Sequence, residues 1–396
     1  MTNKNMPEIR FPGFTEEWEQ RKLGELATIV RGASPRPIQD PKWFDAESDI
    51  GWLRIADVTE QDGKIYSLEQ HISKLGQEKT RVLTEPHLLL SIAATVGKPV
   101  VNYVKTGVHD GFLIFLNAIF DKEFMFQWLE MFRPKWQKYG QPGSQVNLNS
   151  ELVRNQEMLI PINEEQQKIG IFFKQLDDTI ALHQRELELL KETKKGFLQK
   201  MFPKEGEKVP EIRFPGFTEE WEQRKFNNLV VRVNKITNSN SLPKIEFEDI
   251  LAGEGRLNKD VSQKFDNRKG VEFLPNDILY GKLRPYLKNW LKPSFTGVAL
   301  GDFWVFRVMK SDSDFIYSLI QSDKYQRVAN DTSGTKMPRS DWKKVSETEF
   351  LVPDNRNEQQ KIGNFFKQLD DTIALHQCEL DLLKETKKGF LQKLFV

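Results

Sequence analysis

The chain has 396 residues, with 58 Lys and Arg against 57 Asp and Glu, and its formal net charge is +1. This length predicts two or three domains, and the charge balance excludes an overall basic field as a source of affinity for nucleic acid. The single cysteine, Cys378, excludes intrachain disulfides and cysteine-based metal sites, which is typical of a reducing compartment. Because we find no secretory signal and no apolar run of about 18–20 residues, we expect a cytoplasmic protein.

A short segment near the start of the chain occurs twice. Pro7–Lys22, with the sequence PEIRFPGFTEEWEQRK, recurs without change at Pro210–Lys225. The threonine of each copy precedes acidic residues, which is typical of a helix N-terminus. We therefore expect a short helix in each copy, anchored to a hydrophobic core by Trp18 and Trp221.

Each short repeat is followed by a domain-sized region, Leu23–Glu164 in the first half and Phe226–Asn357 in the second, and the two regions differ in sequence. Their apolar patterns predict mixed α/β domains. We expect strands over 50–58, 87–93, 98–104, 112–117, 271–273, 277–280 and 303–308, and helices over 124–131, 315–322 and 325–330.

A long repeat closes each half. Glu165–Phe202 recurs at Glu358–Phe395, 193 positions later, with 34 of 38 residues identical. Its apolar residues alternate at steps of four and three, which is the heptad pattern of a coiled coil. The predicted seam consists of Ile169, Phe173, Leu176, Ile180, His183, Leu187, Leu190 and Phe197 in the first copy, and of Ile362, Phe366, Leu369, Ile373, His376, Leu380, Leu383 and Phe390 in the second.

The differences between the copies support this seam. Three of the four lie at heptad positions that face water, and the fourth, Met201 against Leu394, conserves volume. We therefore expect the two helices to pair with each other, and an antiparallel pair would place one domain at each end. The alternative is that each helix packs on a separate domain core.

Two histidines, His183 and His376, interrupt the apolar seam near the middle of each helix. If the helices are antiparallel and centred there, the two side chains approach each other. The alternative is that they are independent polar residues of the seam.

Catalytic motifs are absent from the sequence. We find no phosphate-binding loop, no dinucleotide or S-adenosylmethionine fingerprint and no Asn/Asp-Pro-Pro-aromatic methyltransferase motif. The five histidines show no metal-binding spacing, so we expect neither catalytic residues nor a metal site.

Polar loops in both variable regions carry side chains that can reach base edges and phosphates. In isolation, each loop could equally be an ordinary solvated loop, but both regions have them in comparable places. The candidate DNA-binding residues are Arg31, Ser34, Arg36, Arg54, Lys98, Ser144, Gln145 and Asn147 in the first region, and Lys282, Arg284, Tyr286, Lys288, Thr335, Lys336 and Arg339 in the second.

The length of the predicted helices suits two separate contact sites on DNA. A helix of about 36 residues is about 54 Å long. Two domains at the ends of such a rod could contact one DNA duplex at half-sites about 34 Å apart, on the same groove. Because the two domains differ in sequence, the target would be split and non-palindromic.

The chain resembles, over essentially its full length, the specificity subunits of type I restriction–modification enzymes. Besides the repeated plan of variable domain and long helix, the similar stretches are Leu90–Val101 (LSIAATVGKPVV), Gly143–Asn149 (GSQVNLN), Ile160–Asp178, Asn276–Leu287 (NDILYGKLRPYL), Gly334–Trp342 (GTKMPRSDW), Phe350–Pro353 and Glu358–Asp371. The resemblance implies a non-catalytic adaptor that recognises double-stranded DNA at a bipartite, asymmetric target. It also implies that two modification (adenine methyltransferase) subunits and restriction/translocase subunits bind to the adaptor, and that S-adenosylmethionine, ATP and Mg²⁺ belong to those partners.

We therefore expect an α+β protein in which two mixed α/β target-recognition domains are separated by two long helices. The helices would form an antiparallel intramolecular coiled coil with pseudo-twofold symmetry. The expected boundaries are residues 1–160 and 203–352 for the domains, and 161–202 and 353–396 for the spacer helices. The alternatives are a coiled-coil adaptor whose two domains bind proteins or peptides, and a self-sufficient DNA enzyme.

Overall fold

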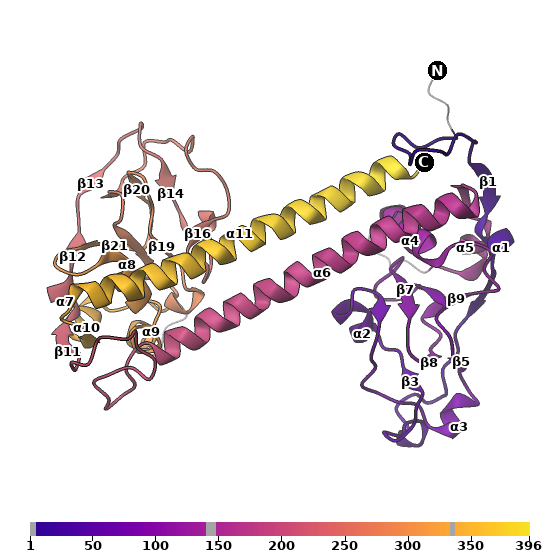
Figure 1. Ribbon diagram of the computed structural model, residues 1–396, viewed down its shortest axis with the longest axis horizontal. Coiled ribbons are helices and arrows are strands. Elements are labelled where there is room, and N and C mark those ends of the chain that lie inside the picture. Colours follow the sequence, from indigo (N-terminus) through magenta and orange to yellow (C-terminus); the bar gives the residue numbers. More distant parts are fainter. Residues whose placement is uncertain (1–4, 140–147, 333–336) are drawn as a thin grey trace. The chain divides into compact units, whose positions relative to one another are not determined.

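The computed structural model describes residues 5–139, 148–332 and 337–396, and it divides into two compact units (Figure 1). Unit 1 consists of Met1–Leu182 and Leu380–Val396, and unit 2 consists of His183–Glu379. Each unit therefore contains one variable region together with a part of each long helix.

Unit 1 is built on a mixed five-stranded sheet and a smaller three-stranded sheet. The larger sheet has the order β2 (Thr28–Arg31), β9 (Phe112–Leu116), β6 (Leu88–Ser91), β7 (Pro99–Asn102), β4 (Lys64–Ile65). The smaller has the order β3 (Gly51–Trp52), β8 (Thr106–Val108), β5 (Arg81–Leu83). The helices are α1 (Leu23–Leu26), α2 (Ile55–Glu60), α3 (Lys74–Gln77), α4 (Lys122–Trp136) and α5 (Ser150–Asn155). Helix α4 begins where the Asp121 carboxylate accepts a hydrogen bond from the Phe124 N–H, and its apolar residues join the main core of the unit.

Unit 2 repeats the centre of this strand arrangement with a different sequence, but its sheets differ at their edges. Its first sheet has the order β12 (Val230–Val233), β21 (Phe303–Val308), β18 (Ile278–Gly281), β19 (Trp290–Leu291). Its second has the order β13 (Ile236–Thr237), β17 (Gly270–Phe273), β20 (Gly297–Ala299), β14 (Lys244–Ile245), and β15 (Ile250–Leu251) pairs with β16 (Arg256–Leu257). The helices are α7 (Phe226–Leu229), α8 (Ser313–Leu319), α9 (Asp323–Asn330) and α10 (Trp342–Glu347).

The two variable regions share one topology. Strand β8 lies between a parallel neighbour, β3, and an antiparallel one, β5, and β20 lies in the same way between β14 and β17. Three residues separate β8 from β9, and three residues separate β20 from β21. Strands β9 and β21 each pair with two antiparallel neighbours. The short connections between β8 and β9 and between β20 and β21 are therefore equivalent.

The expected short helix in each copy of the short repeat is wrong. These residues form strand β1 (Glu19–Lys22), which pairs with β10 (Glu157–Ile160), and strand β11 (Glu222–Lys225), which pairs with β22 (Glu349–Val352). A strand partner that lies far along the chain overrides the local helix signal. The role expected for the tryptophans is confirmed, since Trp18 and Trp221 are each 2% exposed.

Most other expected elements are confirmed, but residues 50–58 do not form one strand. Only Gly51–Trp52 is a strand, and α2 starts at Ile55. The carboxylate of Asp57 accepts a hydrogen bond from the Arg54 backbone N–H, and this contact closes the first turn of the helix. Local capping therefore ends the strand early.

The long helices α6 (Asn163–Lys200) and α11 (Arg356–Leu394) run side by side in opposite directions, as the magenta and yellow ribbons of Figure 1 show. In unit 1 the rings of Phe172 and Phe390 are 5.0 Å apart, and in unit 2 those of Phe197 and Phe365 are 4.9 Å apart. All of the predicted seam residues are buried or half-buried. The antiparallel coiled coil predicted from the heptads is thus confirmed.

Lysines on the seam take part in ion pairs between the helices. Lys194 pairs with Asp370 at 2.6 Å in unit 2, and Lys387 pairs with Asp177 at 2.6 Å in unit 1. These pairs explain how a lysine is accommodated on an otherwise apolar seam. Across the described residues, no helix is both long enough and apolar enough to cross a membrane.

A buried ion pair ties each short repeat to the start of a long helix. In unit 2 the Arg213 guanidinium donates two hydrogen bonds, of 2.6 and 2.8 Å, to the Glu358 carboxylate. In unit 1 Arg10 binds Glu165 in the same way, at 2.7 and 2.8 Å. The glutamate side chains are 1% and 0% exposed, so neither carboxylate can turn to solvent for a replacement partner.

The Arg213→Ala substitution leaves the Glu358 carboxylate buried without its cation. We expect it to lower the free energy of unfolding by about 3–5 kcal/mol, as measured by urea denaturation followed by circular dichroism. Arg224→Ala is the matched control, because among the described residues Arg224 forms ion pairs only with the exposed carboxylates of Glu222 and Asp354, and it should cost about 0–1 kcal/mol. Equal effects of the two substitutions would show that the buried pair has no special role.

Candidate DNA-recognition surfaces

In unit 1 the predicted basic loop gathers around Asp110, in the connection between β8 and β9. The Ser34 hydroxyl donates a hydrogen bond of 2.8 Å to the Asp110 carboxylate, and the Arg36 guanidinium binds its other oxygen at 2.8 Å. The Arg31 guanidinium donates to the Asp110 backbone carbonyl at 2.6 Å. Three residues that the sequence analysis selected therefore share one acidic partner, which it did not select.

The Asp110 carboxyl is held in its charged form. Partial burial opposes ionisation, but the Ser34 hydrogen bond and the charges of Arg36 and Arg31 outweigh it, so the pKa of Asp110 lies below its usual range. Burial lowers the pKa of the neighbouring His109, which favours a neutral imidazole. The cluster thus combines exposed cations with one fixed anion.

This cluster borders a cleft of 670 Å³. Its walls are mostly apolar, with the Trp52 indole and Ile55 opposite the proline-rich loop, and Arg36 and Arg54 bring positive charge to it. Arg54 is held in place by Asp57 at 2.7 Å and Glu69 at 3.0 Å. Hydrogen bonds to Asp57 and then Glu69 raise its pKa, so the guanidinium stays charged.

Lys98 lies outside this cluster. Its side chain is 11% exposed, and its ammonium binds both Asp62, at 2.5 Å, and Glu130. Burial lowers the pKa of Lys98, but the charges of Glu130 and Asp62 outweigh it and raise the pKa overall. Lys98 is therefore both nearly buried and bound by two carboxylates, which leaves its ammonium unavailable to DNA, whereas the side chain of Arg54 is 35% exposed.

In unit 2 the equivalent connection, between β20 and β21, carries Asp302. The Arg339 guanidinium binds its carboxylate at 3.1 Å, and the Lys282 ammonium lies 3.5 Å away. The Lys282 backbone N–H also donates to the Asp302 carbonyl at 2.9 Å. A bridge between Leu283 and Arg339 joins the two predicted loops, so Lys282 and Arg339 belong to one surface.

The loop that follows β18 exposes further predicted residues. Arg284 and Lys288 both have left-handed backbone conformations, with φ of 48° and 56°, on either side of a single 3₁₀ turn. The Arg284 N–H donates to the Pro338 carbonyl at 2.7 Å, which fixes the turn against the second loop. The Arg284 and Lys288 side chains are exposed, and Tyr286 between them is 55% exposed. This arrangement offers two cations and a phenol ring to a ligand.

Five predicted residues, Ser144, Gln145, Asn147, Thr335 and Lys336, lie outside the described residues. A further cleft of 510 Å³ in unit 2, between residues 202–208 and α9, contains none of the predicted residues.

The expected approach of the two histidines is confirmed, since the ring centroids of His183 and His376 are 5.9 Å apart.

Comparison of the sequence with known protein families shows which family the chain belongs to. The profile described as "Type I restriction modification DNA specificity domain" matches residues 15–192 and 286–385, which is more than half of the chain. The chain belongs to the family of type I restriction–modification specificity subunits.

Relatives and solved structures agree with this membership. The chain is 22% identical to the type I restriction enzyme MjaVIII specificity subunit of Methanocaldococcus jannaschii, over 99% of this chain and 94% of that protein. It is 21% identical to the putative MjaX specificity subunit of the same organism, over 70% of this chain and 65% of that protein. The crystal structure of a type I system S subunit from M. genitalium covers 99% of both chains with a TM-score of 0.64 at 13% identity. A structure described as showing complex assembly and conformational transition of the type I restriction–modification system matches 98% of this chain, with a TM-score of 0.53 at 15% identity.

Specificity subunits are the non-catalytic DNA-recognition component of type I systems, and this family membership confirms the non-catalytic role predicted from the sequence.

Asp110 and Asp302 were not among the residues predicted from the sequence, which are basic, amide and hydroxyl side chains. A single aspartate in a short connection carries no distinguishing signal in one sequence. Only the shared strand order shows that both specificity-subunit domains place a carboxylate in the same connection, with basic side chains around it.

Replacing Asp302 by Asn tests whether its cluster faces DNA. The substitution frees Lys282 and Arg339 to bind phosphates, so log Kobs should fall more steeply with log[salt], by about 1–2 in slope, while the preference for the specific site declines. Fluorescence anisotropy of the complex with modification subunits measures both quantities. Asp354→Asn is the matched charge control on the segment between β22 and α11, and a slope change equal to that of the control would argue against the assignment.

Proposed function

We propose that this specificity subunit recognises a split, asymmetric DNA sequence and holds modification subunits on it. The observation that carries the proposal is the pair of domains whose central strands have the same order and which carry different side chains at equivalent connections. A common scaffold presents both domains to DNA in the same manner, whereas different side chains select different bases. The two halves of the target therefore differ.

The first half-site would be read by the surface around Asp110 and the second by the surface around Asp302. The proposed DNA contacts are Arg31, Ser34, Arg36 and Arg54 in unit 1, and Lys282, Arg284, Tyr286, Lys288 and Arg339 in unit 2. The residues in the undescribed loops, Ser144, Gln145, Asn147, Thr335 and Lys336, remain predictions for the same surfaces.

The chemistry of these side chains suits base recognition. Arginine and lysine bind the O6 and N7 atoms of guanine or hold phosphates, and a carboxylate accepts from the N4 amino group of cytosine. The side chains of Arg284 and Lys288 have no ion-pair partner among the described residues, so binding DNA breaks no existing contact. We expect each base contact to contribute about 1–3 kcal/mol of discrimination.

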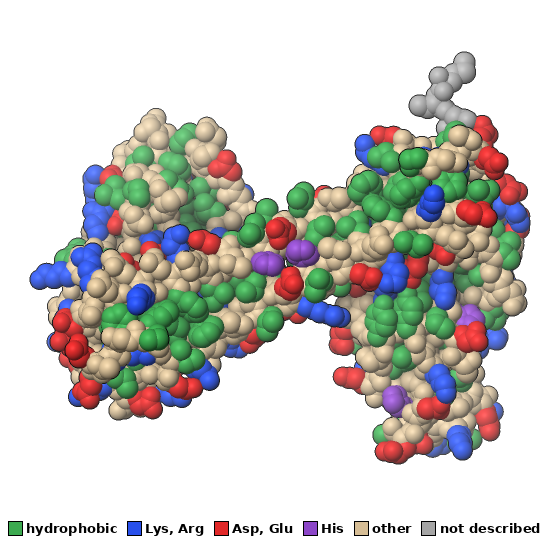
Figure 2. Space-filling model, viewed as in Figure 1, with side chains coloured by type: hydrophobic (Ala, Val, Ile, Leu, Met, Phe, Trp, Pro, Cys, Tyr) green, Lys and Arg blue, Asp and Glu red, His purple; other side chains and the backbone are tan. Residues whose placement is uncertain are grey.

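The outer face of the long helices is the proposed binding site for modification subunits. Leucines at one heptad position are strongly exposed, namely Leu182 (55%) and Leu189 (68%) in α6 and Leu375 (58%) and Leu382 (66%) in α11. Figure 2 shows hydrophobic side chains on the surface of the paired helices. Because the repeat places the same leucines on both helices, two identical partners could bind in the same way.

Those partners would supply the chemistry. We propose that the modification subunits carry S-adenosylmethionine and methylate adenine, and that restriction subunits use ATP and Mg²⁺. The double-stranded DNA and the protein partners would then meet on this one chain.

Methylome sequencing tests the function directly. In a host that expresses the modification subunit, we expect a split, asymmetric adenine-methylated motif that disappears when this chain is deleted. Replacing residues 226–357 by the corresponding region of another specificity subunit should change one half of the motif and leave the other. An unchanged methylome, with a modification subunit shown to be active, would instead favour an adaptor that binds proteins through its two domains.

The same assay tests the second surface at residue level. We expect the triple substitution Lys282→Ala, Arg284→Ala and Lys336→Ala to abolish methylation or relax the second half of the motif only. A motif of unchanged sequence and occupancy would mean that these residues do not contact the DNA.

The leucine face yields a separate prediction. Leu189→Glu with Leu382→Glu should weaken modification-subunit binding, because burying one leucine contributes about 1.5–3 kcal/mol, or roughly 10–150-fold in affinity. Co-purification and calorimetry measure this binding. Ile171→Asn is the matched control, since Ile171 is also exposed (57%) and the second copy of the repeat carries Asn364 at this position. Wild-type affinity in the double variant would place the docking site elsewhere.

A further inference from the structure

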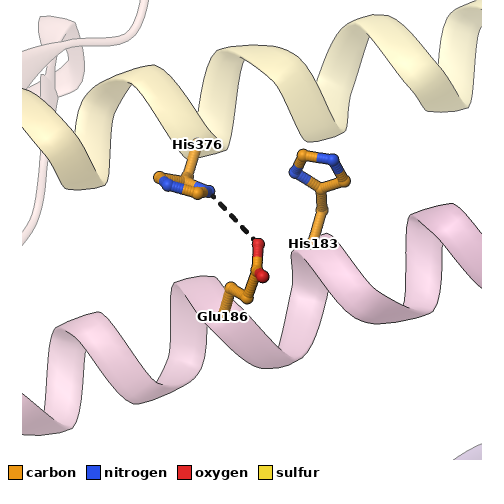
Figure 3. A group of neighbouring side chains, drawn as sticks. All are labelled: His183, Glu186 and His376. Carbon is orange, nitrogen blue, oxygen red and sulfur yellow. Dashed lines mark ion pairs between the residues drawn. The ribbon is translucent and has the colours of Figure 1, made fainter.

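The paired helices carry a polar cluster that DNA recognition does not use. The motif His-Gln-x-Glu occurs in both copies of the long repeat, as His183–Glu186 in α6 and His376–Glu379 in α11. All four residues belong to unit 2. Antiparallel packing brings the two motifs together, and Figure 3 shows both imidazoles and the Glu186 carboxylate between the helices.

The distances within the cluster are those of an almost closed coordination site. Ligand atoms of His183, Glu186 and His376 all lie within 4.8 Å of one another. Glu379 lies next to this group of three, because its carboxylate oxygen is 3.8 Å from His183 Nδ1, just as a Glu186 oxygen is 3.8 Å from His376 Nδ1. Ligands around a tetrahedral Zn²⁺ are about 3.3 Å apart, so side-chain rotations that bring these atoms closer by up to about 1.5 Å would close the site.

Neither imidazole has a good hydrogen-bond partner at Nδ1. Both Nδ1 atoms are shielded from solvent and make no hydrogen bond, and 3.8 Å to a carboxylate oxygen is too long for one. A shielded polar atom without a partner is unfavourable, and a metal ion bound to both nitrogens would remove the penalty. The two carboxylates would also offset the charge of a divalent cation.

We propose that His183, Glu186, His376 and Glu379 form a binding site for a divalent transition metal, with Zn²⁺ as the best match to two imidazoles and two carboxylates. Metal sites between facing helices are commonly built from histidine and glutamate spaced three residues apart. The bound ion would cross-link α6 to α11 and fix their register at this point. No metal-binding spacing is visible in the sequence, because the two halves of the site are 193 residues apart.

The side chains are open enough to admit an ion. The histidines are 24% and 25% exposed and both glutamates are 46% exposed, so a hydrated ion can enter without unfolding of the helices. On the face seen in Figure 2, purple histidine and red acidic side chains lie next to each other on the paired helices.

Cobalt provides the direct test, because Co²⁺ in a protein nitrogen–oxygen site has visible absorption bands that report its ligands. The chain is prepared without a polyhistidine tag, with Cys378→Ser to remove the exposed thiol, and is stripped with chelator. We expect saturable binding of one Co²⁺ per chain, displacement by Zn²⁺, and a higher Tm with Zn²⁺ than without it.

Matched variants separate this site from weak surface binding. Loss of a residue that only supports a metal ligand costs roughly 10–100-fold in affinity, so His183→Gln and His376→Gln should each cost at least about 100-fold. His87→Gln, which removes a histidine far along the chain, should leave the affinity unchanged. Glu186→Gln with Glu379→Gln changes only half-exposed side chains, so it provides the test if the histidine variants do not fold.

The absence of one-to-one Co²⁺ binding would overturn the proposal. The same holds if the His183→Gln and His376→Gln variants, or the double glutamine variant, bind Co²⁺ as tightly as the parent chain. The result does not depend on DNA recognition, because it is read from the metal spectrum and Tm of the chain itself.

Discussion

The antiparallel packing of two nearly identical helices is the constraint on which the rest of this structure depends. Because the helices carry the same heptads in opposite directions, aromatic and ionic contacts of α6 with α11 in one unit recur in the other. Phe172 meets Phe390 as Phe197 meets Phe365, and Asp177 binds Lys387 as Asp370 binds Lys194. One repeated sequence therefore builds two equivalent helix pairs, each joined to its own domain.

The buried arginine–glutamate pairs connect each domain to its long helix. Arg10 and Arg213 come from the short repeat, and their carboxylate partners Glu165 and Glu358 stand in the first turns of α6 and α11. Next to each pair, β1 and β11 pair with the strand that leads into the long helix. The short repeat thus attaches each domain to its helix, which explains why it is identical in both halves whereas the domains are not.

The central strands of the two domains correspond, but the side chains at the equivalent connections differ. A carboxylate in the connection before β9 or β21 binds neighbouring polar side chains, namely the Ser34 hydroxyl and Arg36 on Asp110, and Lys282 and Arg339 on Asp302. If these surfaces bind DNA as proposed, an aspartate in such a position would limit non-specific attraction to phosphates and hold the basic side chains in fixed directions. These are the properties that a subunit needs when its task is to discriminate between sequences.

The sequence by itself determined the heptad seam, the pairing of the helices, the two variable domains and the family, because repeats and periodicity are local patterns. It also located the basic loops, although Lys98 proved to bind two carboxylates inside the domain. Only the tertiary structure decided that the short repeat is a strand, since β1 and β11 depend on partners more than 120 residues away. Likewise, only the packing of α6 against α11 brings His183, Glu186 and His376 within reach of one ion, because contacts between distant segments leave no spacing that a sequence can show.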